Sequence, residues 1–186
     1  MITVRRARPS DATDLAELQA VTWRETYPGL LPQPILDGLT LPRLHRNWRA
    51  ELTSQSEDHD HAILIAERDE EPIGFGTCGM SRGRIDPWDA EINMLYVRAS
   101  AQGRGAGQLL LSAMARHLLA RGMFSAGVWV VRGNGRARRF YERQGGRPSA
   151  FRRDAMQGWL IPVASYRWDD LADLAGVAKA SGWAVE

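Results

Sequence analysis

Three glycines in one short run form the part of this sequence best suited to holding an anion. Gln102-Gly103-Arg104-Gly105-Ala106-Gly107 lies between an apolar segment that favours a strand and one that favours a helix. Glycines there let backbone N–H groups crowd around an anion, and the positive end of the following helix points to the same place. The spacing lacks the Lys-Ser/Thr pair of a nucleotide phosphate loop, and no acidic residue follows about 20 positions later as in dinucleotide-binding turns. The run therefore predicts a phosphate-binding turn, with a plain flexible turn as the alternative.

The charge around this turn is one-sided. The whole chain of 186 residues holds 24 basic and 22 acidic side chains, a formal net charge of +2. From Ile92 to Tyr141, however, there are eight arginines and no Asp or Glu, so this segment carries +8 while the rest is net acidic. A local field of that sign suggests an anionic ligand. A nucleic-acid-binding module is the competing interpretation, disfavoured because aromatic residues are not interleaved with the arginines as a stacking surface.

Alternating strands and helices must position the turn. The apolar periodicity and the Gly and Pro positions predict strands at 2–7, 61–67, 73–80, 91–97, 125–131 and near 160–168. They predict helices that begin at residue 9 and at about residue 42, and further helices at 107–120 and 135–144. Residues 53–60 are expected to form a polar loop. Strand, turn, helix and strand over 91–131 form a βαβ unit with a parallel pair, whereas the hairpin before it is antiparallel. We expect an α/β fold in one domain over residues 1–170, with a mixed, mostly antiparallel central sheet flanked by helices. Residues 171–186 form a tail of uncertain order.

Three stretches together resemble the acyl-CoA-binding core of the GNAT superfamily of N-acetyltransferases. They are Ile-Asn-Met-Leu-Tyr-Val from residue 92, the glycine turn with the Leu-Leu-Leu after it, and an N-x-x-A-x-x-F-Y pattern made by Asn134, Ala137, Phe140 and Tyr141. The resemblance covers residues 2–170. It departs from the family at Ala99-Ser100-Ala101, where relatives often have Pro and an acidic or aromatic residue.

The resemblance implies an enzyme that transfers an acetyl group from acetyl-CoA to a primary amine by direct attack in a ternary complex. It assigns the CoA pyrophosphate to the backbone of residues 102–107, and the pantetheine arm to the backbone of Leu95, Tyr96 and Val97. No metal is expected, because the thioester is already activated. A CoA-binding regulator without catalysis remains an alternative. The fold does not choose among small-molecule and peptide amines as acceptor.

Two residues near the cofactor arm take their roles from the resemblance. Tyr141 is the candidate general acid for the departing thiolate, since a phenol of pKa about 10 and a thiol of about 8.5 are close enough for transfer. Its alternative role is packing beside Phe140. Asn134 can cap the helix that begins at Gly135, and the resemblance adds a contact to the cofactor.

The acceptor side has a candidate base from residue chemistry and a candidate wall from the resemblance. Glu91 is the last acid before the basic segment and is the candidate general base, directly or through water, or else a salt-bridging strand end. Asp86 and Asp89 are less favoured because their loop is irregular. The resemblance implies that the segment between the first two helices shapes the acceptor pocket, so Trp23 and Tyr27, one helical turn apart, are the candidate acceptor wall, with core packing as the alternative for Trp23.

Other classes of protein and site are disfavoured. Cys78 is the only cysteine, so no disulfide can form within the chain. Because Cys78 lies in an apolar strand, we expect it to be an inert core residue. Asp58-His59-Asp60-His61 is expected to face solvent rather than to hold a metal. No apolar stretch approaches a spanning helix and the N-terminus has no secretory h-region, so we expect no membrane partner, no nucleic acid and a cytoplasmic location. Trp183 in the tail suggests packing in cis or in a homodimer.

Overall fold

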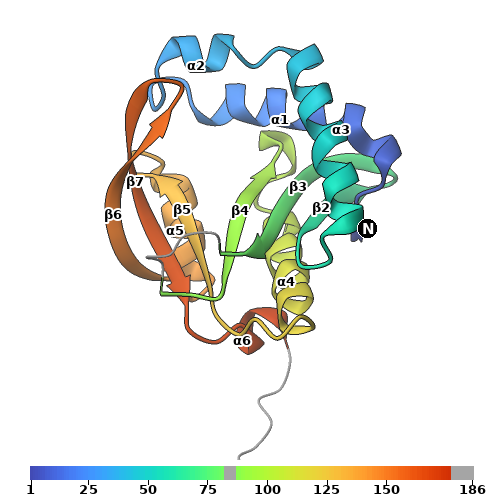
Figure 1. Ribbon diagram of the computed structural model, residues 1–186, viewed down its shortest axis with the longest axis vertical. Helices are drawn as coiled ribbons and strands as arrows, with labels where there is room; N and C mark the ends of the chain where they lie inside the picture. The colour runs from blue at the N-terminus through green and yellow to red at the C-terminus, as the bar shows by residue number, and fades with distance from the viewer. Residues whose placement is uncertain (82–86, 177–186) are drawn as a thin grey trace, which may run out of the picture.

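A seven-stranded sheet forms the middle of the protein in the computed structural model, which describes residues 1–81 and 87–176 (Figure 1). The strand order is β1-β2-β3-β4-β5-β7-β6; β4 and β5 are parallel and the other neighbouring pairs are antiparallel. The strands are β1 (Ile2–Arg6), β2 (Ala62–Arg68), β3 (Glu71–Met80), β4 (Ala90–Val97), β5 (Ala126–Val131), β6 (Arg147–Met156) and β7 (Trp159–Trp168). The helices are η1 (Pro9–Asp11), α1 (Ala12–Thr26), α2 (Gln33–Asp37), α3 (Leu41–Glu57), η2 (Ala99–Ala101), α4 (Ala106–Leu119), α5 (Gly135–Arg143) and α6 (Ala172–Ala175). The expected mixed, mostly antiparallel sheet and its parallel pair are confirmed.

Each face of the sheet has its own hydrophobic core. Helices α1, α2 and α3 cover one face, which we call the α1 face, where Leu15 and Leu18 of α1 are fully buried. Helices α4 and α5 cover the other face, the α4 face, around Leu110, Leu111 and Met114. A helix stripe at i, i+3 and i+4 accounts for both sets, because those positions share one side of a helix. The grouping of α1–α3 on their side of the sheet is visible in Figure 1.

Strands β4 and β5 diverge after a short stretch of pairing. They pair only over Ala90–Ile92 and Ala126–Val128 within the described residues. The register of β4 against β3 shifts between Thr77 and Cys78, so Asn93 is an extra residue in β4. Such a bulge bends a strand and increases its local twist. The sheet therefore opens between the ends of β4 and β5, and Figure 1 shows this divergence near the centre of the molecule.

One expectation about the elements is wrong, and one element was not anticipated. Residues 53–57 belong to α3, not to a polar loop, because Gln55 is buried and bridges backbone groups: its Nε2 donates to the Ala7 carbonyl at 3.2 Å, and its Oε1 accepts from Ile63 N at 2.6 Å. The sequence pattern predicts no element at 147–156, where the structure has β6 at the edge of the sheet. Nearly all of β6 is exposed, so it lacks the apolar alternation that marks a half-buried strand.

The end of the chain is only partly described. After β7, the described residues continue through the short α6 to Gly176. Trp183 lies outside the described residues, and so does Asp86. Where the tail begins and where the domain ends therefore stay predictions.

Candidate active site

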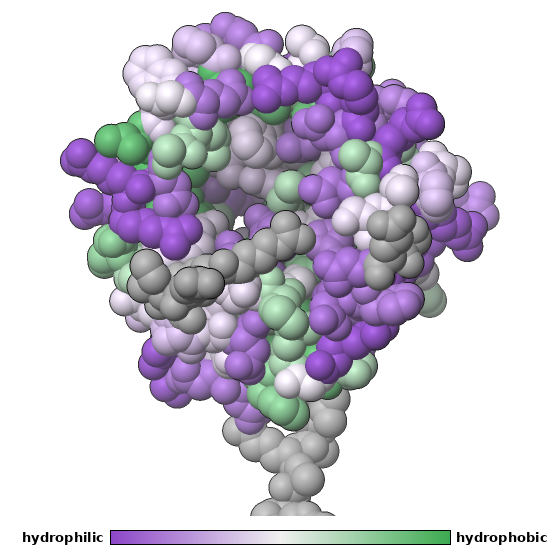
Figure 2. All heavy atoms as spheres, in the orientation of Figure 1, coloured by the Kyte–Doolittle hydropathy of each residue, from purple (hydrophilic) through white to green (hydrophobic). Residues whose placement is uncertain are grey.

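A cavity of about 390 Å³ lies in the opening between β4 and β5. It extends from the glycine turn before α4, past one face of α5, to Thr26 and Tyr27 at the end of α1. Since α5 belongs to one face of the sheet and α1 to the other, the cavity connects the two faces. Figure 2 shows a hollow near the middle of the molecule in this view, with side chains of intermediate hydropathy on its wall.

The glycine turn has the backbone that the sequence predicts. Gly103 and Gly105 have φ of +74° and +89°, and nothing lies within 4 Å of where a Cβ would be placed on either. Backbone conformation, not crowding, therefore requires glycine at both positions. Gly105 is the N-cap of α4, so the amides of the first helical turn end at the cavity.

The Gln102 side chain connects the turn to β4 through a hydrogen bond. Its Nε2 donates to the carbonyl of Val97 at 2.6 Å. Its Oε1 is buried and has no hydrogen-bond partner among the described residues. Gln102 also lines the cavity, so an N–H donor of a ligand there would satisfy this oxygen.

One face of α5 forms the opposite wall. Asn134 caps the helix, its Oδ1 accepting from Ala137 N at 3.0 Å, so the expected cap is confirmed. The spacing of Asn134, Ala137 and Tyr141 places them on one side of the helix, and all three line the cavity. Phe140 packs on Gly107, with two ring atoms 3.4 Å from where a Cβ would lie. This contact holds the start of α4 against α5.

Tyr141 is buried between this wall and the core of the α4 face. Its ring packs edge-on against Phe140 and Trp168, with centroids 5.3 and 6.0 Å away. Burial, and secondarily the nearby Tyr27, raise the pKa of the Tyr141 hydroxyl. The phenol is therefore protonated at neutral pH, so it can donate a proton and cannot serve as a base.

Two other tyrosines meet across the cavity. The hydroxyls of Tyr27 and Tyr96 lie 2.7 Å apart and share a hydrogen bond. Burial raises the pKa of both. Trp23 packs edge-on against Tyr27 with ring centroids 4.9 Å apart, but it is not among the residues that line the cavity. Tyr27 is thus in contact with the cavity, while Trp23 supports it from behind.

Glu91 lies at the closed end of the opening. It pairs with Gly127 of β5, and its neighbours Ala90 and Ile92 belong to the α4 face, so Glu91 is directed to the α1 face. The ring of Trp88 covers Gly127 so closely that a Cβ would come within 2.1 Å of it. Glu91 is not among the residues that line the cavity, although Asn93, two positions later, is.

Most of the sequence-predicted cofactor residues meet at the cavity. Leu95, Tyr96, Val97, Gln102, Gly103, Gly105, Gly107 and Asn134 line it. Arg104 is exposed and Ala106 is buried in the core of the α4 face, and neither lines it. Of the eight arginines between residues 92 and 141, Arg136 is the one whose described position lines the cavity. Arg98 and Arg138 instead bond to Glu71 and to the Tyr166 hydroxyl.

Several lining residues were not singled out from the sequence. Gln108 lies one turn into α4, and Arg143 and Gln144 continue the α5 face. Helical spacing would have indicated all three, since Gln108 is three positions after Gly105, and Arg143 and Gln144 are three and four positions after Phe140. Met94 and Trp129 also line the cavity, but which face of a strand a residue takes near a bulge is not readable from alternation.

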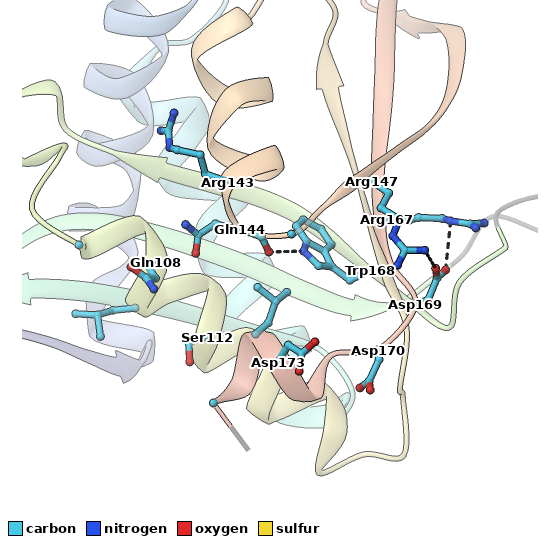
Figure 3. Close-up of a pocket in the computed structure, with 15 residues that line it drawn as sticks. Gln108, Ser112, Arg143, Gln144, Arg147, Arg167, Trp168, Asp169, Asp170 and Asp173 are labelled. Atoms are coloured by element: carbon cyan, nitrogen blue, oxygen red, sulfur yellow. Dashed lines mark hydrogen bonds and ion pairs between the residues drawn. The ribbon is translucent and has the colours of Figure 1, made fainter. Parts of the chain in front are cut away.

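A second, larger hollow of about 800 Å³ adjoins this cavity on the side of α4 and α6. Gly105, Gln108, Arg143 and Gln144 line both. Figure 3 shows Gln108 and Ser112 on α4, Arg143 at the end of α5, and Gln144 directly after it, next to Trp168 at the end of β7. Trp168 Nε1 donates to the Gln144 carbonyl at 2.9 Å, and Arg147 and Arg167 pair with Asp169 at 3.3 and 3.2 Å.

The two remaining candidate residues are Asp89, which is held by hydrogen bonds, and Cys78, which is buried in the core. Asp89 accepts from Phe124 N and Ser125 N at 2.9 and 3.0 Å, and these bonds lower the pKa of its carboxyl. Cys78 is fully buried, as expected, and burial raises the pKa of its thiol to about 12.

Among residues 1–81 and 87–176, no group of three or more His, Cys, Asp or Glu side chains could hold a metal ion. In the same ranges, no helix is both long and apolar enough to cross a membrane.

Similar proteins agree with this architecture. The model of the Acetyltransferase (GNAT) family matches residues 15–146. The chain is 29% identical to an uncharacterized N-acetyltransferase of Bacillus subtilis, over 72% of this chain and 74% of the relative. It is 30% identical to a probable N-acetyltransferase of Mycobacterium tuberculosis, over 89% and 92%.

Solved structures share the fold at lower identity. The PaiA N-acetyltransferase of Thermoplasma acidophilum, in complex with coenzyme A, has a TM-score of 0.70 and 19% identity over 90% of this chain and 99% of that one. The yncA protein of Salmonella typhimurium, a putative acetyltransferase with its cofactor acetyl-CoA, has a TM-score of 0.68 and 17% identity over 91% and 94%. With the family match over most of the chain, these findings show that the protein belongs to the GNAT family of acetyltransferases.

Proposed function

We propose that this protein transfers an acetyl group from acetyl-CoA to a primary amine by direct attack in a ternary complex. The observation that carries the proposal is the continuous cavity between β4 and β5. It brings a phosphate-binding type of turn, a protonated tyrosine and an opening toward the opposite face of the sheet into one space. A donor and an acceptor can enter such a space from different faces and meet inside it.

The residues of the cavity fit the donor. The positive-φ turn at Gly103 and Gly105 leaves open space for phosphate oxygens against the first amides of α4. Arg136 and Arg143 add positive charge to the same lining. The hollow of Figure 3 continues from this turn and offers room for the nucleotide end of the molecule.

The free edge of β4 fits the arm that carries the acetyl group. Past Ile92, β4 has no pairing with β5 in the described residues, so backbone groups of Leu95, Tyr96 and Val97 on that edge are available to an extended ligand, apart from the Val97 carbonyl to which Gln102 donates. An amide-containing arm can add there like a further strand. A backbone N–H of the same edge would then donate to the carbonyl oxygen as charge builds on it.

The transfer itself needs one group to give a proton and another to take one. The amine nitrogen attacks the thioester carbonyl carbon, the C–N bond forms and the C–S bond breaks. Tyr141 then gives its hydroxyl proton to the departing sulfur. Burial raises the pKa of that hydroxyl, but the same desolvation raises the pKa of a thiol in the cleft, so the two stay close.

The proton of the amine is assigned to Glu91. Its side chain is directed to the α1 face, the face from which the acceptor would enter past Tyr27. Since Glu91 does not line the cavity, a water molecule would relay the proton. Asn134 would hold the donor through its Nδ2 amide, because Oδ1 is used by the helix cap.

The two alternative functions have less support. A nucleic-acid module would need the basic segment as an exposed surface, whereas Arg98 and Arg138 are engaged with neighbours and Arg136 lines the cavity. A CoA-binding regulator would share the cavity but need no proton donor.

Thermal denaturation with acetyl-CoA, followed by thiol release with a broad amine panel, tests the proposal. We expect stabilisation that saturates with acetyl-CoA and amine-dependent thiol release. Stabilisation without thiol release would favour the regulator. Absence of stabilisation, together with salt-sensitive binding of RNA, would favour the nucleic-acid module.

A further inference from the structure

The α1-face end of the cavity has an aromatic and apolar lining. Tyr27 from α1, Met94 and Tyr96 from β4, and Trp129 from β5 line it, with Thr26 beside them. Because the Tyr27 and Tyr96 hydroxyls bond to each other, they present ring surface with their polar atoms already paired. We call these five residues the acceptor end.

A packed aromatic cluster fixes this wall from behind. Trp23 lies 4.9 Å from Tyr27 and 6.1 Å from Tyr96, and Phe75 lies 5.5 Å from Tyr96, all measured between ring centroids. Phe75 is fully buried. Rings held in this way are pre-ordered and lose little freedom when a flat ligand packs on them.

The charge at this end disfavours a polycation. None of the described residues that line the cavity is acidic. Glu91 is directed to this face but lies outside the lining. Arg152 stacks over the Trp129 ring at 3.7 Å and is held by Asp154 through two hydrogen bonds of 2.6 and 3.2 Å. A second ammonium group of a ligand would therefore lack a carboxylate in the lining and would lie near an arginine.

Taking the proposed function as given, we infer that the acceptor is a primary monoamine on a flat aromatic carrier, an arylalkylamine in chemical class. Its ring packs on Tyr96, Met94 and the side of the Trp129 ring that Arg152 does not cover, while the amine is directed to the middle of the cavity. The nitrogen forms its bond to the acetyl carbon as the C–S bond breaks; the sulfur gains a proton and the nitrogen loses one. The products are an N-acetylated arylalkylamine and CoA with a free thiol, so no other reactant is required.

The first test compares two amines that share the reacting group. We would measure kcat/KM at saturating acetyl-CoA for 2-phenylethylamine and for 1,4-diaminobutane. Burial of an aromatic ring predicts a preference of about 10- to 100-fold for 2-phenylethylamine. Equal or greater kcat/KM for the diamine would overturn the inference while leaving the proposed function standing. Failure of acetyl-CoA to bind would instead overturn the proposed function.

The second test changes the wall. Trp129→Leu is expected to lower kcat/KM for 2-phenylethylamine by about tenfold or more, because ring contact is lost, with little change in the Kd of acetyl-CoA. Phe124→Leu is the matched control, since Phe124 is an exposed aromatic residue outside the lining, and it should leave both values unchanged. An unaltered kcat/KM in folded Trp129→Leu would contradict the inference.

A third variant covers the case in which Trp129→Leu does not fold. Thr26→Asp puts a carboxylate into the lining at the last residue of α1. It should shift the ratio of the two kcat/KM values toward the diamine, because the second ammonium gains a partner. A ratio that does not move, or moves toward 2-phenylethylamine, would count against the aromatic acceptor end.

Discussion

Ile92 and Met94 stand two positions apart in β4, yet their side chains belong to opposite faces of the sheet. Ile92 lies in the core of the α4 face, and Met94 packs against the core of the α1 face. In a regular strand, residues i and i+2 share a face. The register shift opposite Thr77 and Cys78 adds Asn93 to β4 and reverses the alternation.

This bulge interrupts the continuous sheet and leaves room for the cavity between β4 and β5. Pairing between β4 and β5 ends at Ile92, directly before the extra residue. Beyond it, Tyr96 is directed to the α1 face, while the cavity passes through to Tyr141 on the α4 face. The same local irregularity thus opens one space to both faces of the sheet.

Gly105→Ala should weaken acetyl-CoA binding more than it weakens the fold. A positive φ at a non-glycine residue costs about 1–2 kcal/mol. Gly122 has a similar φ of +75° and equally open surroundings but does not line the cavity, so Gly122→Ala is the matched control. Chemical denaturation should show similar losses for both variants. Calorimetric titration should show a Kd for acetyl-CoA raised about tenfold in Gly105→Ala alone, a loss of about 1.4 kcal/mol. Equal Kd values would contradict phosphate binding at the turn.

Tyr141→Phe should lower kcat while leaving the Kd of acetyl-CoA nearly unchanged, because a proton donor is lost and the ring remains. General acids contribute about 10²- to 10⁴-fold, which sets the expected loss. A general acid is active at pH values below its pKa, and burial raises the pKa of the Tyr141 hydroxyl. We therefore expect kcat to fall on the alkaline side only at a pH above the ordinary tyrosine pKa of about 10. The pH profile of kcat checks this. A limb near pH 8 that survives in Tyr141→Phe would assign the proton to another group.

Glu25→Ala should loosen the approach to the glycine turn. Glu25 Oε2 accepts from Ala99 N at 2.8 Å, which ties the end of α1 to η2 just before Gln102. Loss of one such bond predicts a KM for acetyl-CoA raised about 2- to 10-fold, with kcat little changed. Glu25→Gln should recover most of the loss, because its amide oxygen can accept the same bond.

Ala99→Pro tests the same contact from the other side. Proline has no N–H to leave unsatisfied and suits the first position of a helical turn. In the Glu25→Ala background it should therefore bring KM back toward that of the native protein. If Glu25→Ala and Glu25→Gln behave alike and Ala99→Pro restores nothing, Glu25 does not position the turn.

Asp11→Asn should destabilise the fold in a pH-dependent way. Asp11 accepts two hydrogen bonds from Arg5, at 2.7 and 3.0 Å, and one from Arg8 N at 2.6 Å. Chiefly through Arg5, these bonds lower the pKa of the carboxyl. The stabilisation is therefore full above the unfolded pKa of about 3.9 and is lost as the pH falls through the lower folded value.

Urea denaturation of Asp11→Asn measures that stabilisation. The expected loss is about 1.5–3 kcal/mol at pH 7, narrowing as the pH drops below about 4. Asp69→Asn removes an acid that is 80% exposed and should change stability by less than about 1 kcal/mol. A loss for Asp11→Asn that is the same at pH 7 and pH 3 would contradict the ionic origin.

The βαβ unit and its turn could be predicted because their signals are local. The glycines of the turn, the apolar run of α4 and the spacing from Asn134 to Tyr141 each lie within one or two turns of chain. The contacts that complete the site are not local. Glu25 and Ala99 are 74 positions apart, and Tyr27 and Tyr96 are 69 apart. A pattern within one segment of the sequence cannot indicate a contact with a residue so far along the chain.

Charge counting indicated the segment that contains the glycine turn but not which arginines line the cavity. The basic segment contains the turn, yet Arg104 is exposed and does not line the cavity, while Arg143, beyond the segment, lines it. A sum of charges has no direction, whereas an arginine's contribution depends on which face of its helix it occupies. The exposed β6 escaped prediction for a related reason, because an edge strand with little buried surface carries no apolar alternation.

Free thiol released from acetyl-CoA in the presence of 2-phenylethylamine tests the central claim most directly. The account predicts thiol release that is equimolar with N-acetylated amine, saturates with both substrates, and falls strongly in Tyr141→Phe. Binding of acetyl-CoA without thiol release above the amine-free rate, for this and every other primary amine in the panel, would contradict it.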